Sequence, residues 1–260
     1  MPASSLWLRL AGAVLVLLPG LLLLRSSVRR VRKAVTVRAA KSVAAGDLSP
    51  GDLVSVEGEA VPLTDERIPA HLLDEDGLAV GTQVKRESGA SNEYGGGQQW
   101  KTGRSHFAQV PFAVDDGTGR IAVDVPAIDA FPSEVDFWDS VQLKARTVAD
   151  SDPDVRGRAE EFDEYAFDGE TSIGETTTTR RYTQGILHEG DTVAVTGRVR
   201  RNADGDLVLA DETASFALSN TGDRGPSARD WLVSGVGRGV LAGLLVALGG
   251  GAVALPLLPL

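Results

Sequence analysis

Three histidines, His71, His106 and His188, are the residues best suited to acid–base or metal chemistry in this chain. They lie in separate segments, without the i, i+4 or other close spacing that a zinc site requires. His188 stands just before a Gly-Asp turn and is expected to be a capping or turn residue. The chain has no cysteine, which excludes disulfides, thiolate zinc sites and cysteine nucleophiles. We therefore predict no catalytic, cofactor-binding or metal-binding residue.

The run Asp115-Asp116-Gly117-Thr118-Gly119 is open to two interpretations, a calcium loop or a hairpin turn. The alternating acid spacing and the later glutamate of a calcium loop are missing, so we expect a hairpin turn. Nucleophile-elbow, phosphate-loop and dinucleotide-binding motifs do not occur.

A group of arginines forms the strongest basic patch within the acidic part of the chain: Arg180, Arg181, Arg198, Arg200 and Arg201. The patch either grips an acidic partner or pairs with the domain's own carboxylates. We expect the second arrangement.

Charge is distributed unevenly along the chain. All 36 acidic residues lie between Asp47 and Asp230, together with only 17 of the 26 basic residues, so this part carries an excess of 19 negative charges. Such a domain repels nucleic acid and anionic headgroups, and we expect no nucleic-acid partner. Acid-rich, lysine-poor and cysteine-free composition is typical of a halophilic archaeon; the alternative is an ordinary acidic protein from a GC-rich genome.

Two segments share the pattern Gly-Asp-x-Val-x-Val-x-Gly and predict the framework of the fold. They begin at Gly51 and at Gly190. Alternation puts the paired valines of each copy on one buried face, and the closing glycine suggests a bulge or bend. We expect both strands to frame a small barrel.

Other patterns also favour β structure. Residues 110–125 read as a hairpin, residues 131–148 as a short helix or another strand, and residues 88–99 and 150–179 as flexible loops. The expected fold is a mainly β domain over residues 45–220, an OB-like small barrel.

Both ends of the chain are apolar. We predict a tail at 1–4, a transmembrane helix at 5–25, a basic juxtamembrane segment at 26–44, a linker at 221–231 and a second transmembrane helix at 232–260. The alternative for the first helix is a cleaved signal peptide. Positive charges following it place the domain in the cytoplasm. The second helix has the small-residue spacing of a helix–helix contact, through which the protein could bind itself, at Gly235, Gly239 and Gly243.

The order of these features resembles the GIDE family, whose soluble part is the BAM (beside a membrane) domain. The matching residues are Val54-x-Val56-x-Gly58, Trp100, Phe112-x-Val114-Asp115-Asp116-x-Thr118-Gly119 with Val123-Asp124, and Arg181-Tyr182-Thr183-Gln184-x-Ile186-Leu187-x-x-Gly190-Asp191-x-Val193-x-Val195-x-Gly197. The resemblance covers about residues 45–215 and includes membrane helices in the same places.

The resemblance implies a membrane protein that makes regulatory contacts or self-associates through its BAM domain. The best-known members are E3 ubiquitin ligases of organelle outer membranes, in which a zinc-binding RING built on Cys and His performs catalysis. Because this chain has no cysteine, we expect a membrane-anchored scaffold without ligase activity of its own. The alternatives are an inherited E3 ubiquitin transferase label and a membrane-bound enzyme, either a hydrolase or a metal-dependent one.

Overall fold

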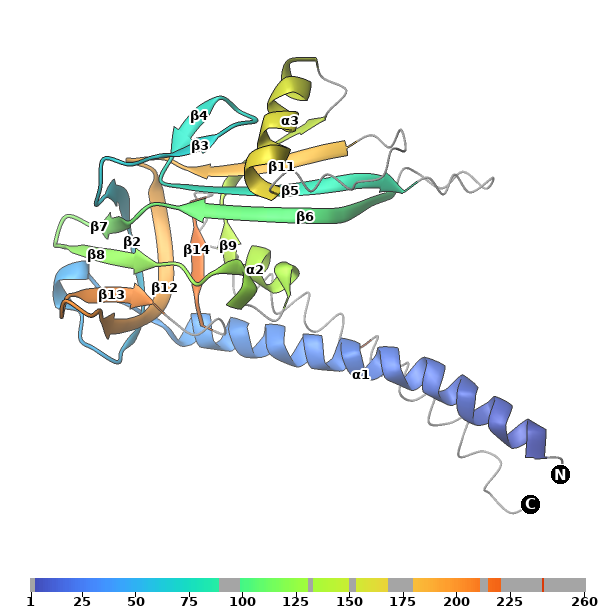
Figure 1. Cartoon of the computed structure of the whole chain (residues 1–260). Helices are drawn as coiled ribbons and strands as arrows, with labels where there is room; N and C mark the ends of the chain where they lie inside the picture. The colour runs from blue at the N-terminus through green and yellow to red at the C-terminus, as the bar shows by residue number, and fades with distance from the viewer. Residues whose placement is uncertain are drawn as a thin grey trace. The chain divides into compact units, whose positions relative to one another are not determined.

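The protein is described by a computed structural model that covers residues 3–88, 99–130, 133–149, 153–167, 180–210, 215–220 and 240 (Figure 1). The chain divides into two units. One consists of Lys41–Gly225, and the other of Met1–Ala40 together with Pro226–Leu260. The predicted loop at 88–99 falls almost wholly outside the described residues, as do the predicted linker and the whole of 232–260 except Val240.

Helix α1 runs without interruption from Ala3 to Ala39. The basic residues that follow the apolar stretch 5–25 therefore continue the same helix. Within the described ranges, no helix combines the length and the apolar character needed to cross a membrane. The two spans remain predictions from the sequence.

A closed five-stranded barrel forms one part of the larger unit, Lys41–Gly225. Its strands are β2 (Leu53–Pro62), β7 (Phe112–Asp115), β8 (Arg120–Asp124), β13 (Leu207–Ala210) and β12 (Thr192–Arg201), and β12 pairs with β2 to close the ring. All neighbours are antiparallel except β8 and β13. The predicted mainly β fold with a small barrel is confirmed. The same sheet is extended by β1 (Lys41–Ser42), β14 (Ala217–Ser219) and β9 (Val141–Gln142).

The two Gly-Asp segments become neighbours, β2 and β12, related by a local twofold axis through the pair Val56 and Val195. Each turn bonds to the far end of the other strand in the same way. The Gly51 N–H donates to the Val199 carbonyl at 2.8 Å, and the equivalent Gly190 N–H donates to the Ala60 carbonyl at 2.9 Å. Both turn glycines have positive φ, at 94° and 80°, which explains the glycine in each copy.

The glycine that closes each Gly-Asp segment does not mark a bulge, because the β2–β12 register is continuous. At Gly58 the reason for glycine is contact, since an added Cβ would overlap the Asp115 carbonyl oxygen. At Gly197 the nearest atom to an added Cβ, on Phe216, is 3.7 Å away. Position 58 therefore has no room for a side chain, whereas position 197 could hold a Cβ at ordinary contact distance.

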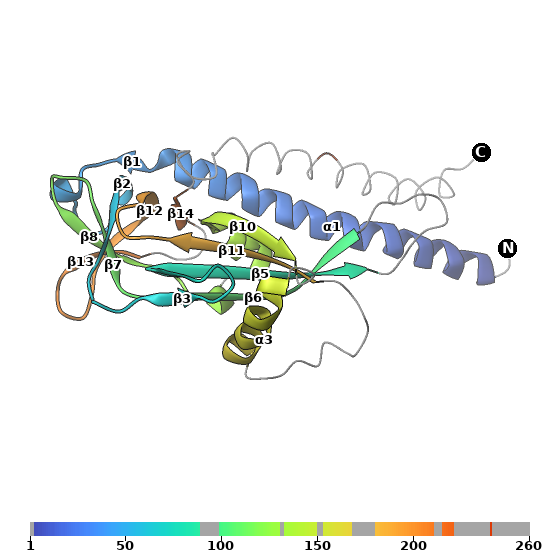
Figure 2. The same ribbon diagram turned by 90° about the horizontal axis from the view of Figure 1, so that it is seen from above.

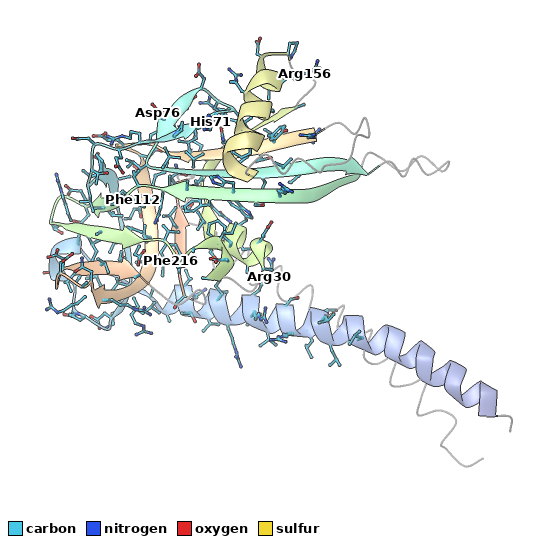
Figure 3. All side chains as sticks on the ribbon, viewed as in Figure 1. Arg30, His71, Asp76, Phe112, Arg156 and Phe216 are labelled. Atoms are coloured by element: carbon cyan, nitrogen blue, oxygen red, sulfur yellow. The ribbon has the colours of Figure 1, made fainter. Side chains whose placement is uncertain are left out.

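The predicted hairpin at 110–125 is confirmed as β7 and β8, joined by a turn with Gly117 at positive φ. Its apolar side chains enter the barrel core. They meet the valines of both Gly-Asp strands there, together with Leu209, Phe216 and Leu218. Phe112 and Phe216 are labelled in Figure 3.

A second sheet, which sequence reasoning does not predict, is built from β10 (Lys144–Ala149), β11 (Arg180–Leu187), β5 (Ala79–Ser88) and β6 (Gln99–Gln109), in that order. It comes from long insertions between β2 and β7 and between β8 and β12. The first insertion also holds the small pair β3 (Ile68–Ala70) and β4 (Glu75–Gly77).

One face of the second sheet is covered by α3 (Pro153–Phe167) (Figures 1 and 2). Val155, Ala159 and Phe162 of this helix pack on Leu72, Val84 and Tyr182. The predicted loop at 150–179 is therefore wrong for residues 153–167, and residues 168–179 lie outside the described ranges. Burial of one apolar stripe stabilises this helix, although the acidic composition of the segment favours a loop.

Helix α2 (Glu134–Ser140) packs on the other face of the second sheet, where Trp138 lies over Gly81. Its N-cap is Ser133, whose hydroxyl accepts the Asp136 N–H. Sequence reasoning leaves residues 131–148 open between helix and strand, and the segment contains both, because α2 is followed by β9 and β10. Two short 3₁₀ turns, η1 (Ala45–Asp47) and η2 (Ile128–Ala130), complete the unit.

Candidate functional site

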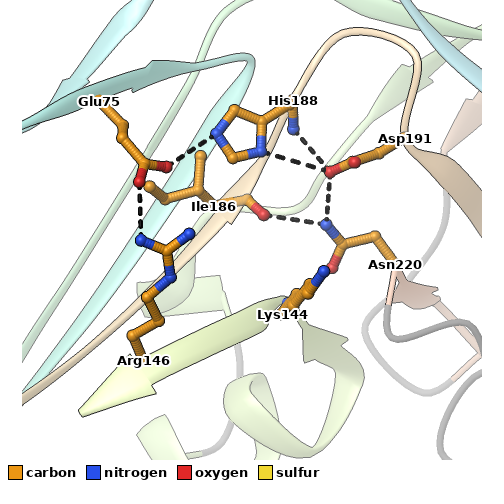
Figure 4. A network of polar contacts seen from close by, with 7 residues as sticks. All are labelled: Glu75, Lys144, Arg146, Ile186, His188, Asp191 and Asn220. Atoms are coloured by element: carbon orange, nitrogen blue, oxygen red, sulfur yellow. Dashed lines mark hydrogen bonds and ion pairs between the residues drawn. The ribbon is translucent and has the colours of Figure 1, made fainter. Parts of the chain in front are cut away.

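His188 lies in the turn that takes the chain from β11 of the second sheet into β12 of the barrel, at the centre of a polar network (Figure 4). Its backbone N–H donates to Asp191 Oδ2 at 2.9 Å. The Asn220 side chain donates to the same carboxylate oxygen at 3.0 Å and to the Ile186 carbonyl at 2.9 Å. Asn220 Oδ1 accepts the backbone N–H of Lys144 at 2.7 Å. The prediction of His188 as a turn residue is confirmed.

Two carboxylates flank the His188 ring. Glu75 Oε2 is 3.2 Å from Nε2, and Asp191 Oδ2 is 3.6 Å from Nδ1. Glu75 also pairs with Arg146 at 2.7 Å. A histidine between carboxylates is suited to proton transfer, but here each carboxylate also holds a second structural group. The network fixes β4, β10 and the β11–β12 turn together at the junction of the two sheets.

A pocket of about 290 Å³ opens beside this network, at the β3–β4 turn. Asp74 in this turn has φ of 54°, a left-handed conformation that is uncommon outside glycine. In the described ranges, no cluster of three or more His, Asp or Glu residues could hold a metal ion. The pocket lining is acidic and consists of Pro69, Ala70, His71, Asp74, Glu75, Asp76 and Arg158. Figure 3 labels His71 and Asp76 in this region.

His71, which lines this pocket, lies close enough to His106 to interact with it electrostatically, although 35 residues separate them in sequence. Burial lowers the pKa of His106, and the charge of His71 lowers it further. His106 lies across from Thr82 in the β5–β6 register, and its ring contacts Phe162 of α3 edge-on, with centroids 6.0 Å apart. The structure thus brings two of the three histidines together, while His188 pairs with Glu75, another residue of the pocket lining.

A second cleft, of about 280 Å³, lies on the α2 face of the second sheet. Gly81 and Gly185 lie side by side on β5 and β11, and Leu143 packs directly against Gly185. An added Cβ at Gly81 would be 2.6 Å from the Trp138 ring. We call this the Trp138 cleft, and its lining is Gly81, Gln83, Trp138, Val141, Gln142, Leu143, Ala145, Thr183 and Gly185.

The acidic run at 115–119 is a hairpin turn, as expected. Asp116 accepts hydrogen bonds from the Thr118 hydroxyl at 2.6 Å and from the Ala45 and Thr118 backbone N–H groups at 2.8 and 2.9 Å. These bonds, the Thr118 hydroxyl first, lower the pKa of Asp116 to about 2. The Gly117 N–H and then Arg120 lower the pKa of Asp115. Both side chains hold the turn, and Asp116 also anchors η1.

Two arginines of the basic patch, Arg198 and Arg201, bond to backbone carbonyls and form no ion pair with a described carboxylate. The Arg198 guanidinium donates to the Gly51 carbonyl, and that of Arg201 to the Gly205 carbonyl, each at 2.7 Å. Arg180 donates to the Tyr182 hydroxyl at 3.5 Å. The expectation of carboxylate partners is therefore wrong for Arg198 and Arg201, which fasten turns of the barrel instead.

Four residues that matter at these sites carry no sequence signal strong enough to be singled out: Glu75, Trp138, Arg146 and Asn220. The hydrogen-bond partners of Glu75, Arg146 and Asn220 lie at least 29 residues away along the chain. Trp138 packs on Gly81, which is also remote in sequence. The neighbouring patterns therefore could not reveal them.

Comparison with known proteins gives no relative from which a function could be carried over: the chain matches no protein-family model and no curated protein sequence.

Proposed function

We propose that the chain is a membrane-anchored, non-catalytic module that binds or scaffolds another protein, with an OB-like barrel of the GIDE type. One observation supports the proposal that the module is non-catalytic. Two of the polar side chains suited to chemistry, His188 and Asp116, hold turns and junctions of the framework. Side chains committed in this way are suited to fixing a rigid binding surface.

The second sheet supplies the surface for binding. Its outermost strand, β10, is exposed over Lys144–Thr147. Exposed sheet edges and neighbouring clefts are the features that partner proteins use for docking. The barrel and the His188 network hold this edge in place.

The membrane part of the proposal rests on the sequence. The apolar stretch 5–24 is followed by seven basic residues, which suit a cytoplasmic membrane surface. In α1, Leu18, Leu21 and Leu22 are each more than half exposed, as side chains that face lipid would be. Protease added to intact cells or spheroplasts is expected to spare residues 41–225, and digestion from outside would contradict the cytoplasmic placement.

Co-purification tests the interaction function. The full chain, tagged and cross-linked in its native membrane, is expected to recover a reproducible set of proteins. A bait carrying only residues 1–44 on an unrelated soluble domain controls for contacts made by α1. Recovery of the same proteins with both baits, or of none with the full chain, would contradict the proposal.

The acidic pocket at β3–β4 favours a second candidate, a hydrolytic enzyme. His71, three carboxylates and Arg158 line this pocket, and a histidine with carboxylates is the usual acid–base equipment. Turnover in a hydrolase substrate screen that disappears in His71→Asn, with the fold retained, would favour this candidate. The E3 ligase activity implied by the resemblance needs the Cys ligands of a RING, and these 260 residues contain none.

A further inference from the structure

Strand β10 is the last strand of the second sheet on its side, where β11 is its only neighbour among the described strands. Lys144, Ala145, Arg146 and Thr147 are all exposed. An edge strand presents a row of unpaired backbone N–H and C=O groups, which can pair with an added strand. The edge is therefore a template for an extended segment.

Side chains of β10 alternate between two environments. Ala145 lines the Trp138 cleft, and Arg146 faces the opposite side, where it pairs with Glu75 at 2.7 Å. Lys144 shares the Arg146 side, since side chains two positions apart lie on one face. The Lys144 ammonium forms no ion pair with any described residue.

An added strand continues this alternation. One set of its side chains lies beside Ala145 at the mouth of the cleft, which Trp138, Val141 and Leu143 make partly apolar. The other set lies on the side of Lys144 and Arg146. Arg146 is already paired with Glu75, so an acidic side chain is favoured next to the Lys144 ammonium. The chemistry of the two faces thus selects an extended segment in which apolar and acidic residues alternate.

A second copy of this chain fits the edge less well. Antiparallel pairing of two β10 strands brings the Lys144 and Arg146 side chains of one copy close to those of the other, and like charges across a sheet are destabilising. The positive side chains at this edge therefore favour an acidic partner over a second copy.

We propose that the β10 edge and the Trp138 cleft together bind an extended, alternating acidic and apolar segment of a partner protein as an added strand. This inference rests on the proposed interaction function and specifies the chemistry of the partner.

Fluorescein-labelled octapeptides test the proposal by anisotropy on the purified full-length chain. The probe alternates Glu and Val, and a Lys/Val peptide reverses its charge. Two further probes carry N-methyl groups on one or the other alternate set of amides. Only alternate residues of an added strand donate to the edge, so methylation of one set is expected to abolish binding and methylation of the other to leave most of it.

Charge reversal on the protein completes the test. Lys144→Glu is expected to weaken binding of the Glu/Val peptide at least about fivefold. Lys41→Glu makes the same charge change on an exposed residue of β1 and is expected to leave binding unchanged. The proposal is overturned by absence of saturable binding, by equal binding of the Glu/Val and Lys/Val peptides, by equal effects of the two methylation patterns, or by self-association that Lys144→Glu abolishes.

Failure here is distinguishable from failure of the proposed function. If proteins co-purify with the full chain while the peptides do not bind, partners dock elsewhere and only the inference on β10 is lost. If nothing co-purifies, the interaction function itself is lost.

Discussion

Gly58 and Gly197 hold equivalent positions in the two Gly-Asp strands, and only Gly58 is pressed against another strand. An added Cβ at Gly58 would overlap the Asp115 carbonyl, whereas the nearest atom at Gly197 is 3.7 Å away. Gly58→Ala is therefore expected to lower the free energy of unfolding by about 1–3 kcal/mol, as overpacking does. Gly197→Ala, the matched control, is expected to change it by less than about 1 kcal/mol. Urea unfolding of both variants checks this, and equal losses would contradict the contact at Gly58.

Acidification is expected to destabilise the domain through His106. Burial, and then the charge of His71, lowers the pKa of His106 in the folded state below the ordinary value of 6.5. The unfolded chain takes up the proton first, so this contribution to stability is complete well above pH 6.5 and is lost progressively as pH falls through 6.5 towards the folded-state pKa.

Urea midpoints at about pH 8 and pH 5.5, on either side of the ordinary histidine pKa, measure this loss. His106→Gln is expected to lose less stability between the two pH values than the natural chain, since glutamine does not titrate. Equal losses in both proteins would show that other groups are responsible.

At the scale of elements, the sequence predicts what short-range patterns encode. Val54, Val56, Val193 and Val195 alternate and reveal β2 and β12, and Asp115–Gly119 reveals the β7–β8 turn. Neither segment by itself predicts that the two strands pair with each other about Val56 and Val195. The second sheet could not be predicted from local patterns either, because its β5–β11 pairs, such as Gln83 with Thr183, join residues 100 positions apart.

Helix α3 shows how composition misleads. Its acidic surroundings suggest a solvated loop, yet Val155, Ala159 and Phe162 have the spacing of one helical face, and Pro153 suits the first turn. That periodicity is the signal from which the helix could have been predicted. The buried stripe decides the structure because it covers Leu72 and Tyr182.

Removal of the Phe162 ring tests the importance of this stripe. Phe162 is buried and contacts His106 and Tyr182 edge-on, with centroids 6.0 and 6.4 Å apart. Phe162→Ala is expected to cost about 3–5 kcal/mol of unfolding free energy and to open residues 153–167 to proteolysis. Arg156→Ala, on the exposed face of α3, is expected to change stability by less than about 0.5 kcal/mol. A loss from Phe162→Ala no larger than that of this control would show that α3 does not depend on its buried face.

For the whole molecule, charge is the dominant feature that sequence alone establishes. The 36 acidic and 17 basic residues between Asp47 and Asp230 repel one another on balance, and salt screens that repulsion. The melting temperature is expected to rise between about 0.1 and 2 M KCl, the range over which the screening length falls below the spacing of surface charges. Differential scanning fluorimetry measures it, and a flat or falling melting temperature would contradict both the repulsion and the halophile prediction.

The candidate sites were less predictable than the barrel. The sequence marks His71 and His106 as residues of interest but not their proximity, which depends on the second sheet. It does not mark Trp138, Glu75 or Asn220, whose roles arise only when β4, α2 and the β14 end meet β11. Sites assembled from insertions this long are fixed by tertiary packing rather than by local pattern.

Photo-crosslinking in living cells tests whether this domain binds another protein through the edge of its second sheet. A photoreactive p-benzoylphenylalanine replaces Thr147 on β10 in one version of the full chain, and Thr192 on the barrel strand β12 in the other, both being exposed residues. A defined adduct with another protein is expected from position 147 and none from position 192. No adduct from either position, or the same adduct from both, would contradict binding through this edge.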